Sequence, residues 1–354
     1  MTMGKQRASK SKQIVGLDGL RTLAAVGVLL FHMFPRTVKG GYFGVILFFV
    51  ISGFLTAYNE VRKGGTPIPV YYKKRFFRIY PSLIIMLFIS VEVIALIDKF
   101  KLLNVQEEVA SVLFAYNNYW QISKSADYFA NLSANSAFTH LWYTSILIQF
   151  ELAWPLLYRL FKHYKRGHTM FGILTIVSMA VLPVASLSGS MSQSMLYYST
   201  LTRIHALFIG AWLGWQRAQA ETHHIRRMKP LPVLLVSAGF LAGSIVIYAV
   251  AGGENLWVYH WGIVLYAVLC GLMVRMLSHA DAKASVILDH PICHFVSTYS
   301  YEIYLWQYPV LFAAGLLKLE KHYILQLLVI LLVSVWNHEV LAFVQRLSAR
   351  RKRK

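Results

Sequence analysis

Arg21 and His32 are the first residues in this chain whose types and spacing could support chemistry. They lie in a long apolar stretch, eleven residues apart. In a helix this spacing is close to three turns, so the two side chains share one face, roughly 16 Å apart along the axis. A neutral histidine can take a proton from a hydroxyl, and an arginine can hold a phosphate or a carboxylate. We therefore predict that His32 and Arg21 are catalytic.

Asp18 lies three residues before Arg21 and can form an ion pair with it. A charge inside an apolar segment is costly unless it faces a protein interior or a wet cavity, which favours a functional role. We include Asp18 among the predicted substrate-binding residues. The alternative is that Asp18 and Arg21 form an ion pair at the membrane interface, with His32 capping the helix at the outer boundary.

Arg75 and Arg78 form the second group, in a basic segment that precedes an apolar run. Their i, i+3 spacing places both guanidinium groups on one face of a helix. Planar guanidinium groups suit phosphate, so we predict that both arginines bind a phosphorylated cofactor. The alternative is that they anchor the chain on the inner side of a membrane, a role that Lys73 and Lys74 would share.

Glu151 lies in the middle of an apolar run that begins near His140 and Trp142. His140 and Glu151 are eleven residues apart, so in a helix they too share a face. A carboxylate at this depth lines a cavity or pairs with a cation. We predict that Glu151 is catalytic and that His140 and Trp142 bind substrate. The alternative for Glu151 is a structural pairing with a buried arginine.

A late apolar run contains several polar and aromatic side chains near its middle. We predict that three of them line a substrate cavity: Glu302, Tyr304 and Gln307. Tyrosines also gather at membrane interfaces, but a glutamate and a glutamine fit that alternative poorly. Another apolar run contains Arg203 and His205, two polar side chains that should face the interior of the protein.

Ser52 lies among glycines in the second apolar run and is also predicted to bind substrate. Glycines at 41, 44 and 53 would let helix backbones, or a substrate, approach closely. For each glycine, helix packing is the simpler explanation. Ser52 has no neighbouring base in the sequence, so a role as nucleophile is not indicated.

Membrane-spanning helices must position these residues. Of the 354 residues, 57% are hydrophobic and only 14% are charged, and the mean hydropathy is +0.51. About 20 apolar residues cross a bilayer. We predict an all-α bundle of about ten spans: Ile14–Phe34, Tyr42–Tyr58, Ser82–Ile97, Leu141–Phe161, Met170–Leu187, Leu201–Trp215, Leu231–Val250, Trp257–Leu277, Phe295–Leu317 and Tyr323–Phe343.

The net charge of +20 mostly reflects how the chain is oriented across the membrane. With both termini in the cytoplasm, the inner segments hold 26 of the 35 lysines and arginines, as cytoplasmic loops do in membrane proteins. This placement argues against nucleic acid as a partner. The two cysteines form no zinc or disulfide pattern, and no metal site is predicted. We expect one membrane domain, 1–354, with basic tails at 1–13 and 344–354.

The order of these motifs resembles the membrane-bound acyltransferase-3 family. The resemblance rests on segments 17–21 (LDGLR), 41–45 (GYFGV), 48–55 (FFVISGFL), 75–81 (RFFRIYP), 140–142 (HLW), 154–155 (WP) and 300–309 (SYEIYLWQYP), together with His32. Two positions depart from the family pattern. An acidic pair frequent in the fourth span is replaced by a single, displaced Glu151. Gln307 stands where a histidine is frequent and cannot act as a base, which leaves His32 as the clearest base.

The resemblance implies an O-acyltransferase of a bacterial cell membrane. The donor would be cytoplasmic acyl-CoA, with acetyl as the default acyl group and with no permanently bound cofactor. The acceptor would be a hydroxyl of an extracytoplasmic or lipid-linked glycan. On this reading Arg75 and Arg78 hold CoA phosphates, Arg21 orients the pantetheine arm and His32 activates the hydroxyl. Glu151 fixes the tautomer of a histidine or orients the sugar.

Two other functions remain open from the sequence. The bundle could be a transporter or flippase that moves a lipid-linked saccharide without changing it chemically. It could also pass the acyl group to a separate extracytoplasmic transferase. Some members of the resembled family carry an extra span and an esterase-like domain, and no segment after the tenth predicted span here could form one.

Overall fold

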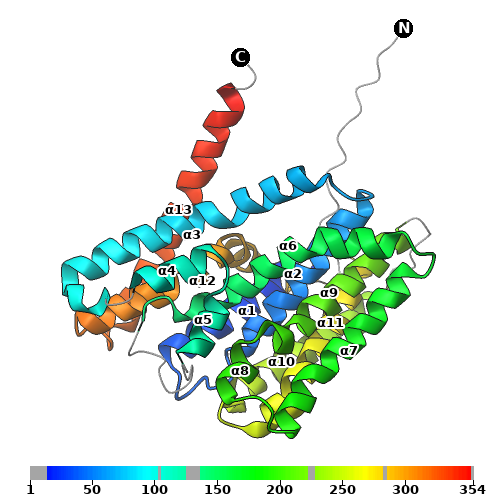
Figure 1. Cartoon of the computed structure of the whole chain (residues 1–354), viewed down its shortest axis with the longest axis horizontal. Helices are drawn as coiled ribbons and strands as arrows, with labels where there is room; N and C mark the ends of the chain where they lie inside the picture. The colour runs from blue at the N-terminus through cyan, green and yellow to red at the C-terminus, as the bar shows by residue number, and fades with distance from the viewer. Residues whose placement is uncertain (1–13, 103–104, 125–135, 222–227, 282–284, 352–354) are drawn as a thin grey trace.

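The computed structural model describes residues 14–102, 105–124, 136–221, 228–281 and 285–351 (Figure 1). These residues form α-helices with short 3₁₀ and π turns, and they contain no β-strand. The only extended pairing among them is an isolated bridge between Met228 and Ala280. The all-α fold class predicted from the sequence is therefore confirmed for the described part of the chain.

A helix lies over each of the ten predicted spans. The long helices are α1 (Leu17–Met33), α2 (Phe43–Arg62), α3 (Ile68–Asp98), α6 (Trp142–Lys162), α7 (Gly167–Leu187), α9 (Thr200–Ala220), α10 (Pro230–Val250), α11 (Ile263–Ser278), α12 (Pro291–Leu316) and α13 (Tyr323–Arg351). Three short helices are α4 (Val105–Leu113), α5 (Asn117–Ser123) and α8 (Gln193–Tyr198). The remaining turns are Lys99–Leu102, Thr139–Leu141 and Val258–Gly262.

Six helical segments in the described residues are long and apolar enough to cross a membrane: α2, α3 with the turn that follows it, α7, α10, α11 with its π turn, and α13. Four long helices fall outside this group, namely α1, α6, α9 and α12. Each of these four carries a charged residue of the predicted polar groups: Arg21, Glu151, Arg203 or Glu302. The chain is thus a multi-pass helical membrane protein. A total of about ten spans, with both termini cytoplasmic, stays a prediction.

Two helices extend beyond the predicted spans. The basic segment before Ser82 forms the first turns of α3, which begins after Pro67 and continues through Pro81. Helix α13 continues past Phe343 to Arg351, because no proline or glycine interrupts this stretch. The short helices α4 and α5 follow one another closely, and Ala115 between them adopts a positive φ of 59°.

Glycine lets the backbones of α1, α2 and α9 touch. A Cβ on Gly53 would lie 2.0 Å from the Leu207 carbonyl oxygen of α9, and one on Gly44 would lie 2.5 Å from the Ala24 carbonyl oxygen of α1. Gly210 of α9 meets the Val50 carbonyl oxygen in the same way, at 2.0 Å. Helix pairs in membranes commonly pack through small residues like these. The predicted close approach of backbones is therefore confirmed.

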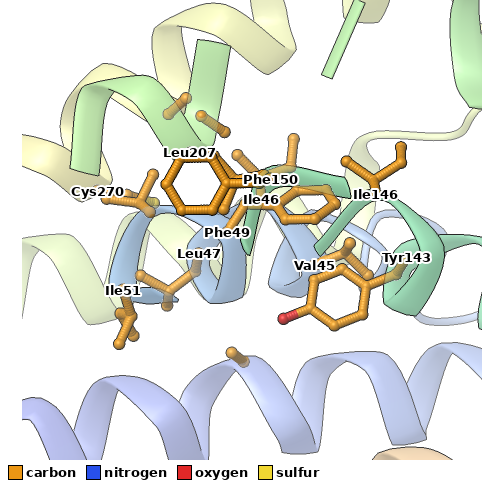
Figure 2. Packing of buried hydrophobic residues seen from close by; sticks show 14 of the residues in the cluster. Val45, Ile46, Leu47, Phe49, Ile51, Tyr143, Ile146, Phe150, Leu207 and Cys270 are labelled. Carbon is orange, nitrogen blue, oxygen red and sulfur yellow. The ribbon is translucent and has the colours of Figure 1, made fainter. Parts of the chain in front are cut away.

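Buried apolar side chains of α2 fill the space between this helix and its neighbours. Figure 2 shows Ile46 and Phe49 of α2 with Phe150 of α6 and Leu207 of α9. Phe49 and Leu207 are almost completely buried. Helix α2 is thus at the centre of the bundle, as 78% burial of its apolar window shows, whereas the corresponding window of α13 is only 17% buried.

Hydrogen bonds tie together loops that were predicted to share one side of the membrane. At one end, Arg159 donates to the Thr66 carbonyl at 3.3 Å, and Tyr58 donates to Glu221 at 2.6 Å. All four residues lie in or next to predicted inner segments. At the other end, the Gly40 amide donates to the Tyr248 carbonyl at 2.8 Å. The long helices that these residues flank therefore run alternately up and down the bundle.

Candidate active site

A cavity of about 250 Å³ opens between α1, α2, α3, α6, α12 and α13. It brings together six of the predicted site residues, from five different helices: Arg21, Ser52, Arg78, Glu151, Glu302 and Tyr304. The remaining predicted residues are not among its lining side chains: Asp18, His32, Arg75, His140, Trp142 and Gln307. The six lining residues lie far apart in the sequence, so only the folded bundle forms this site.

Glu151 pairs with Arg75. The Arg75 Nε lies 3.0 Å from Glu151 Oε2, and Thr56 donates to Glu151 Oε1 at 2.9 Å. Tyr71 also donates to Glu151 Oε2. The partners of Glu151 among the described residues are thus an arginine, a threonine and a tyrosine, and its proposed role in fixing a histidine tautomer or orienting a sugar stays a prediction. Glu151 has the structural pairing that was the alternative, because α3 extends far enough to carry Arg75 down to it.

Arg78, one turn after Arg75, has different surroundings. Its side chain lines the cavity and stays accessible there. The positive charges of Arg21 and Arg78 are close enough to repel each other. Neither side chain makes a hydrogen bond or an ion pair with any residue that the structure describes. The cavity thus contains two neighbouring guanidinium groups whose hydrogen-bond donors remain available to an anion.

Asp18 does not form the ion pair with Arg21 that the sequence suggested. Its carboxylate accepts a hydrogen bond from the Ser297 hydroxyl at 2.7 Å and lies 3.0 Å from His294 Nδ1. Both partners belong to α12, which packs along α1. Asp18 therefore connects α1 to α12 beside the cavity. Its carboxylate does not occupy the hydrogen-bond donors of the Arg21 guanidinium.

A second cluster surrounds His32, near the other end of α1. The His32 ring packs at 5.0 Å from the Tyr308 ring and at 6.4 Å from the His140 ring, measured between centroids. Gln307 forms a hydrogen bond with His32. Three predicted residues from distant parts of the sequence are thus brought together: His32, His140 and Gln307.

His140 is not on the same helix as Glu151, because α6 begins after it, at Trp142. His140 lies in the turn Thr139–Leu141, and its Nε2 is 3.2 Å from the Leu305 carbonyl oxygen. This contact requires the proton on Nε2. The predicted shared face of His140 and Glu151 was therefore wrong.

Tyr304 connects the cavity to the histidine cluster. Its side chain lines the cavity, while its hydroxyl donates to the backbone carbonyl of His140. Trp142 packs against Tyr197 at 5.0 Å between ring centroids and lies under the Arg203 guanidinium. Trp142 and Arg203 are both buried, so they form the wall behind the cluster.

Sequence reasoning missed His338. This residue of α13 lines the cavity, and its Nδ1 lies 3.4 Å from Glu302 Oε1. Ser82 donates to the same carboxylate oxygen at 3.0 Å. Asn337, His338 and Glu339 interrupt a largely apolar span, and polar residues in such a position indicate a functional or structural contact. That interruption was the signal available in the sequence.

Glu108 was also missed as a site residue. It lies on α4, outside the spans, with its carboxylate 2.5 Å from the Ser136 hydroxyl and 3.3 Å from Gln121 Nε2. Burial raises the pKa of Glu108 to about 7, although both hydrogen bonds oppose this shift. Its charge also acts on Tyr308, which packs on His32. A titratable group therefore lies beside the histidine cluster.

Comparison with known proteins identifies the same family that the sequence motifs resemble. The pattern of the acyltransferase-3 family, described as an acyltransferase domain, matches residues 14–336. A protein of Staphylococcus aureus strain COL, provisionally named an O-acetyltransferase, is 27% identical over 88% of this chain and 52% of its own length. The O-acetyltransferase OatA of S. aureus strain NCTC 8325 is 24% identical over 85% of this chain and 51% of its own length.

The chain spans about half the length of these relatives. No solved structure matches it at a significant level. The family pattern covers most of the chain and includes the histidine cluster and all of the residues that line the cavity except His338. On this ground, the chain belongs to the acyltransferase-3 family.

Proposed function

We propose that this protein is an O-acyltransferase of the bacterial cell membrane. It takes an acyl group, acetyl by default, from cytoplasmic acyl-CoA and transfers it to a hydroxyl of an extracytoplasmic or lipid-linked glycan. The observation that carries the proposal is the arrangement along α1. Arg21 of α1 and Arg78 of α3 present two available guanidinium groups at one end of the site, and His32 lies three turns further along α1.

Arg21 and Arg78 bind the phosphates of acyl-CoA in this proposal. Both line the cavity in the half of the bundle that is predicted to face the cytoplasm. Arg75 was the other predicted phosphate ligand, but Glu151 already holds its guanidinium. Arg75 therefore acts through Glu151 and Thr56 to shape the cavity wall. Charge-assisted hydrogen bonds from the two available arginines would bind the anionic phosphates strongly.

His32 is the general base in the proposed reaction. It removes the proton from the acceptor hydroxyl while the hydroxyl oxygen attacks the thioester carbon. The C–S bond breaks as the new C–O ester bond forms, and the proton passes from His32 to the CoA thiolate, so no net proton is consumed. Gln307 and Tyr308 hold the His32 ring, and His140 and Tyr304 form the wall opposite it.

The experiment uses a strain that lacks the gene and is complemented with wild-type protein or with His32→Ala. Mass spectrometry of its envelope glycans should show O-acylation with the wild type and none with His32→Ala at equal protein level. His322→Ala, which removes an exposed histidine at the start of α13, is the matched control and should acylate normally. Wild-type acylation by the His32→Ala strain would reject His32 as the base.

A second arm separates this proposal from the two other functions. Purified protein in liposomes receives labelled acetyl-CoA on one side and a glycan acceptor on the other. Label on the acceptor supports an enzyme. Movement of a lipid-linked saccharide with no chemical change would instead indicate a flippase. Acylation that requires an added extracytoplasmic protein would make the chain an acyl-passing partner of a separate transferase.

A further inference from the structure

His338 brings a ring nitrogen to the cavity that contains Arg21 and Arg78, and the described part of the fold does not use it. The residue lies on α13 and lines the cavity, and its side chain is 33% exposed. Its Nδ1 lies 3.4 Å from Glu302 Oε1, and the Tyr299 ring packs edge-on against its ring at 5.0 Å between centroids. The opposite nitrogen, Nε2, forms no hydrogen bond with any residue that the structure describes.

The Glu302 carboxylate decides which hydrogen bonds Nε2 can make. An ionised carboxylate only accepts, so its contact with Nδ1 favours the proton on that nitrogen and leaves a lone pair on Nε2. Ser82 donates to the same Glu302 oxygen at 3.0 Å and helps to hold it in place. Neutral His338 therefore offers the cavity an acceptor, which suits an N–H or O–H group and does not suit a phosphate oxygen.

The hydroxyl groups of α12 that line the cavity already bind atoms of the protein. They donate their protons to carbonyl or carboxylate oxygens: Ser297, Thr298, Ser300, Tyr301 and Tyr304. These contacts fix the cavity wall around His338. A ligand in this part of the cavity therefore finds, in the Nε2 of His338, a nitrogen that the described fold leaves available.

The Glu302–His338 pair lies between the two available arginines and the histidine cluster. Helices α1 and α12 run side by side in the same direction, because Asp18 contacts Ser297 and His32 packs on α12 further along both helices. Glu302 comes after Ser297 in α12, by roughly 8 Å along the helix axis. The pair is thus beyond the level of the arginines and short of the histidine cluster.

A ligand that reaches from a phosphate at Arg21 and Arg78 to an acyl group beside His32 passes this pair. In acyl-CoA the pantetheine arm joins those two ends, and its amide groups offer N–H donors and carbonyl acceptors. We propose that His338 binds the pantetheine arm of the donor by accepting a hydrogen bond from an amide N–H at Nε2. A protonated His338 would donate to the amide carbonyl, so an amide fits either state. The inference rests on the proposed function and adds the residue that directs the arm towards His32.

The test separates the arm from the nucleotide half of CoA. Isothermal titration of the purified full-length protein in detergent compares CoA with 3′-phospho-ADP, which keeps the phosphates of CoA and lacks the arm. His338→Ala should weaken CoA binding by about fivefold, the usual effect of one hydrogen bond between neutral groups, and leave the affinity for 3′-phospho-ADP unchanged. His322→Ala, at an exposed position next to the start of α13, should bind both ligands like wild type.

Two further variants separate ligand binding from a structural role. His338→Asn keeps a donor at the position of Nδ1 and can still contact Glu302, but it has no group at the position of Nε2. It should melt like wild type and lose CoA affinity by about fivefold, as His338→Ala does. His338→Gln carries an amide at the position of Nε2 and should recover most of the affinity. A purely structural role for His338 predicts the reverse order of these two variants.

Unchanged CoA affinity in His338→Asn overturns the inference and leaves the acyltransferase function intact. An equal loss for CoA and 3′-phospho-ADP also overturns it, because the residue would then act on the whole cavity. A loss confined to the KM of the glycan acceptor, measured in the liposome assay, would place His338 at the acceptor and not at the arm. If neither nucleotide binds to wild-type protein, the donor of the proposed function is rejected, and with it this inference.

Discussion

Arg75 and Glu151 form an ion pair in which the carboxylate is buried and the guanidinium is partly buried, with Arg75 Nε 3.0 Å from Glu151 Oε2. Arg78 lies one helical turn away and has no such partner among the residues that the structure describes. Two arginines that are equivalent in the sequence therefore have different roles in the fold. One stabilises the contact between α3 and α6, and the other presents its donors to the cavity.

The first prediction concerns stability. Arg75→Ala leaves the Glu151 carboxylate buried without its cation, which should lower the free energy of unfolding by about 3–5 kcal/mol. Thermal melting of the purified protein in detergent measures this loss. Lys73→Ala, at an exposed position two residues earlier, is the control and should melt like wild type. Equal melting of Arg75→Ala and wild type would show that the ion pair contributes no stability.

The second prediction concerns acyl-CoA binding. Arg78→Ala removes an available guanidinium from the cavity, and should weaken acyl-CoA binding by roughly ten- to a hundredfold, the range for one charged hydrogen bond. Arg21→Ala should do the same. Isothermal titration with acetyl-CoA measures the change, and Arg166→Ala, in a loop outside the cavity, is the control. Unchanged affinity in both cavity variants would refute the phosphate role.

The third prediction separates binding from chemistry. His32→Gln should reduce acyl transfer by about 10²–10⁴-fold, the usual contribution of a general base, because an amide cannot take up the proton. Acetyl-CoA affinity should remain that of wild type, since Arg21 lies three turns away along α1 and His32 is not among the residues that line the cavity with Arg21 and Arg78. A parallel loss of affinity and transfer would instead indicate that His32 is needed to hold the cavity open.

The fourth prediction concerns pH. The raised pKa of Glu108, about 7 against a usual 4.5, means that the folded protein keeps this proton where the unfolded chain has lost it. Folding therefore takes up a proton between these values, and stability should fall as pH rises from 4.5 to about 7, then change no further through this group. Melting temperatures at about pH 5 and pH 8 should differ in wild type and converge in Glu108→Gln.

The ten helices could be predicted from the sequence because apolar runs of spanning length are a strong and local signal. The sequence also predicted correctly that Arg21 and His32 lie about three turns apart on one helix, since α1 is helical from Leu17 to Met33. The pairing of Glu151 with an arginine was foreseen as an alternative, but Arg75 could not be identified as its partner, because this contact depends on α3 continuing through Pro81. A proline usually signals a helix end.

His338 and Glu108 show a second reason for the misses. His338 contacts Glu302, which lies far away in the sequence, and the charge of Glu108 acts on the equally distant Tyr308. Neither residue carries a local sequence signal of that partner. Only the packing of α13 on α12, and of α4 on α6, brings these residues to the site.

The glycine contacts among α1, α2 and α9 limit how this bundle can open. At Gly44, Gly53 and Gly210 the neighbouring backbones already touch, so these three helices cannot slide or tilt against one another without a clash. Helix α13 contains no glycine, its apolar window is only 17% buried, and side-chain contacts such as Asn337 with the Ser82 carbonyl hold it to the bundle. Entry of a bulky substrate should therefore be lateral, by displacement of α13 from a rigid three-helix frame, and not by rocking of two halves.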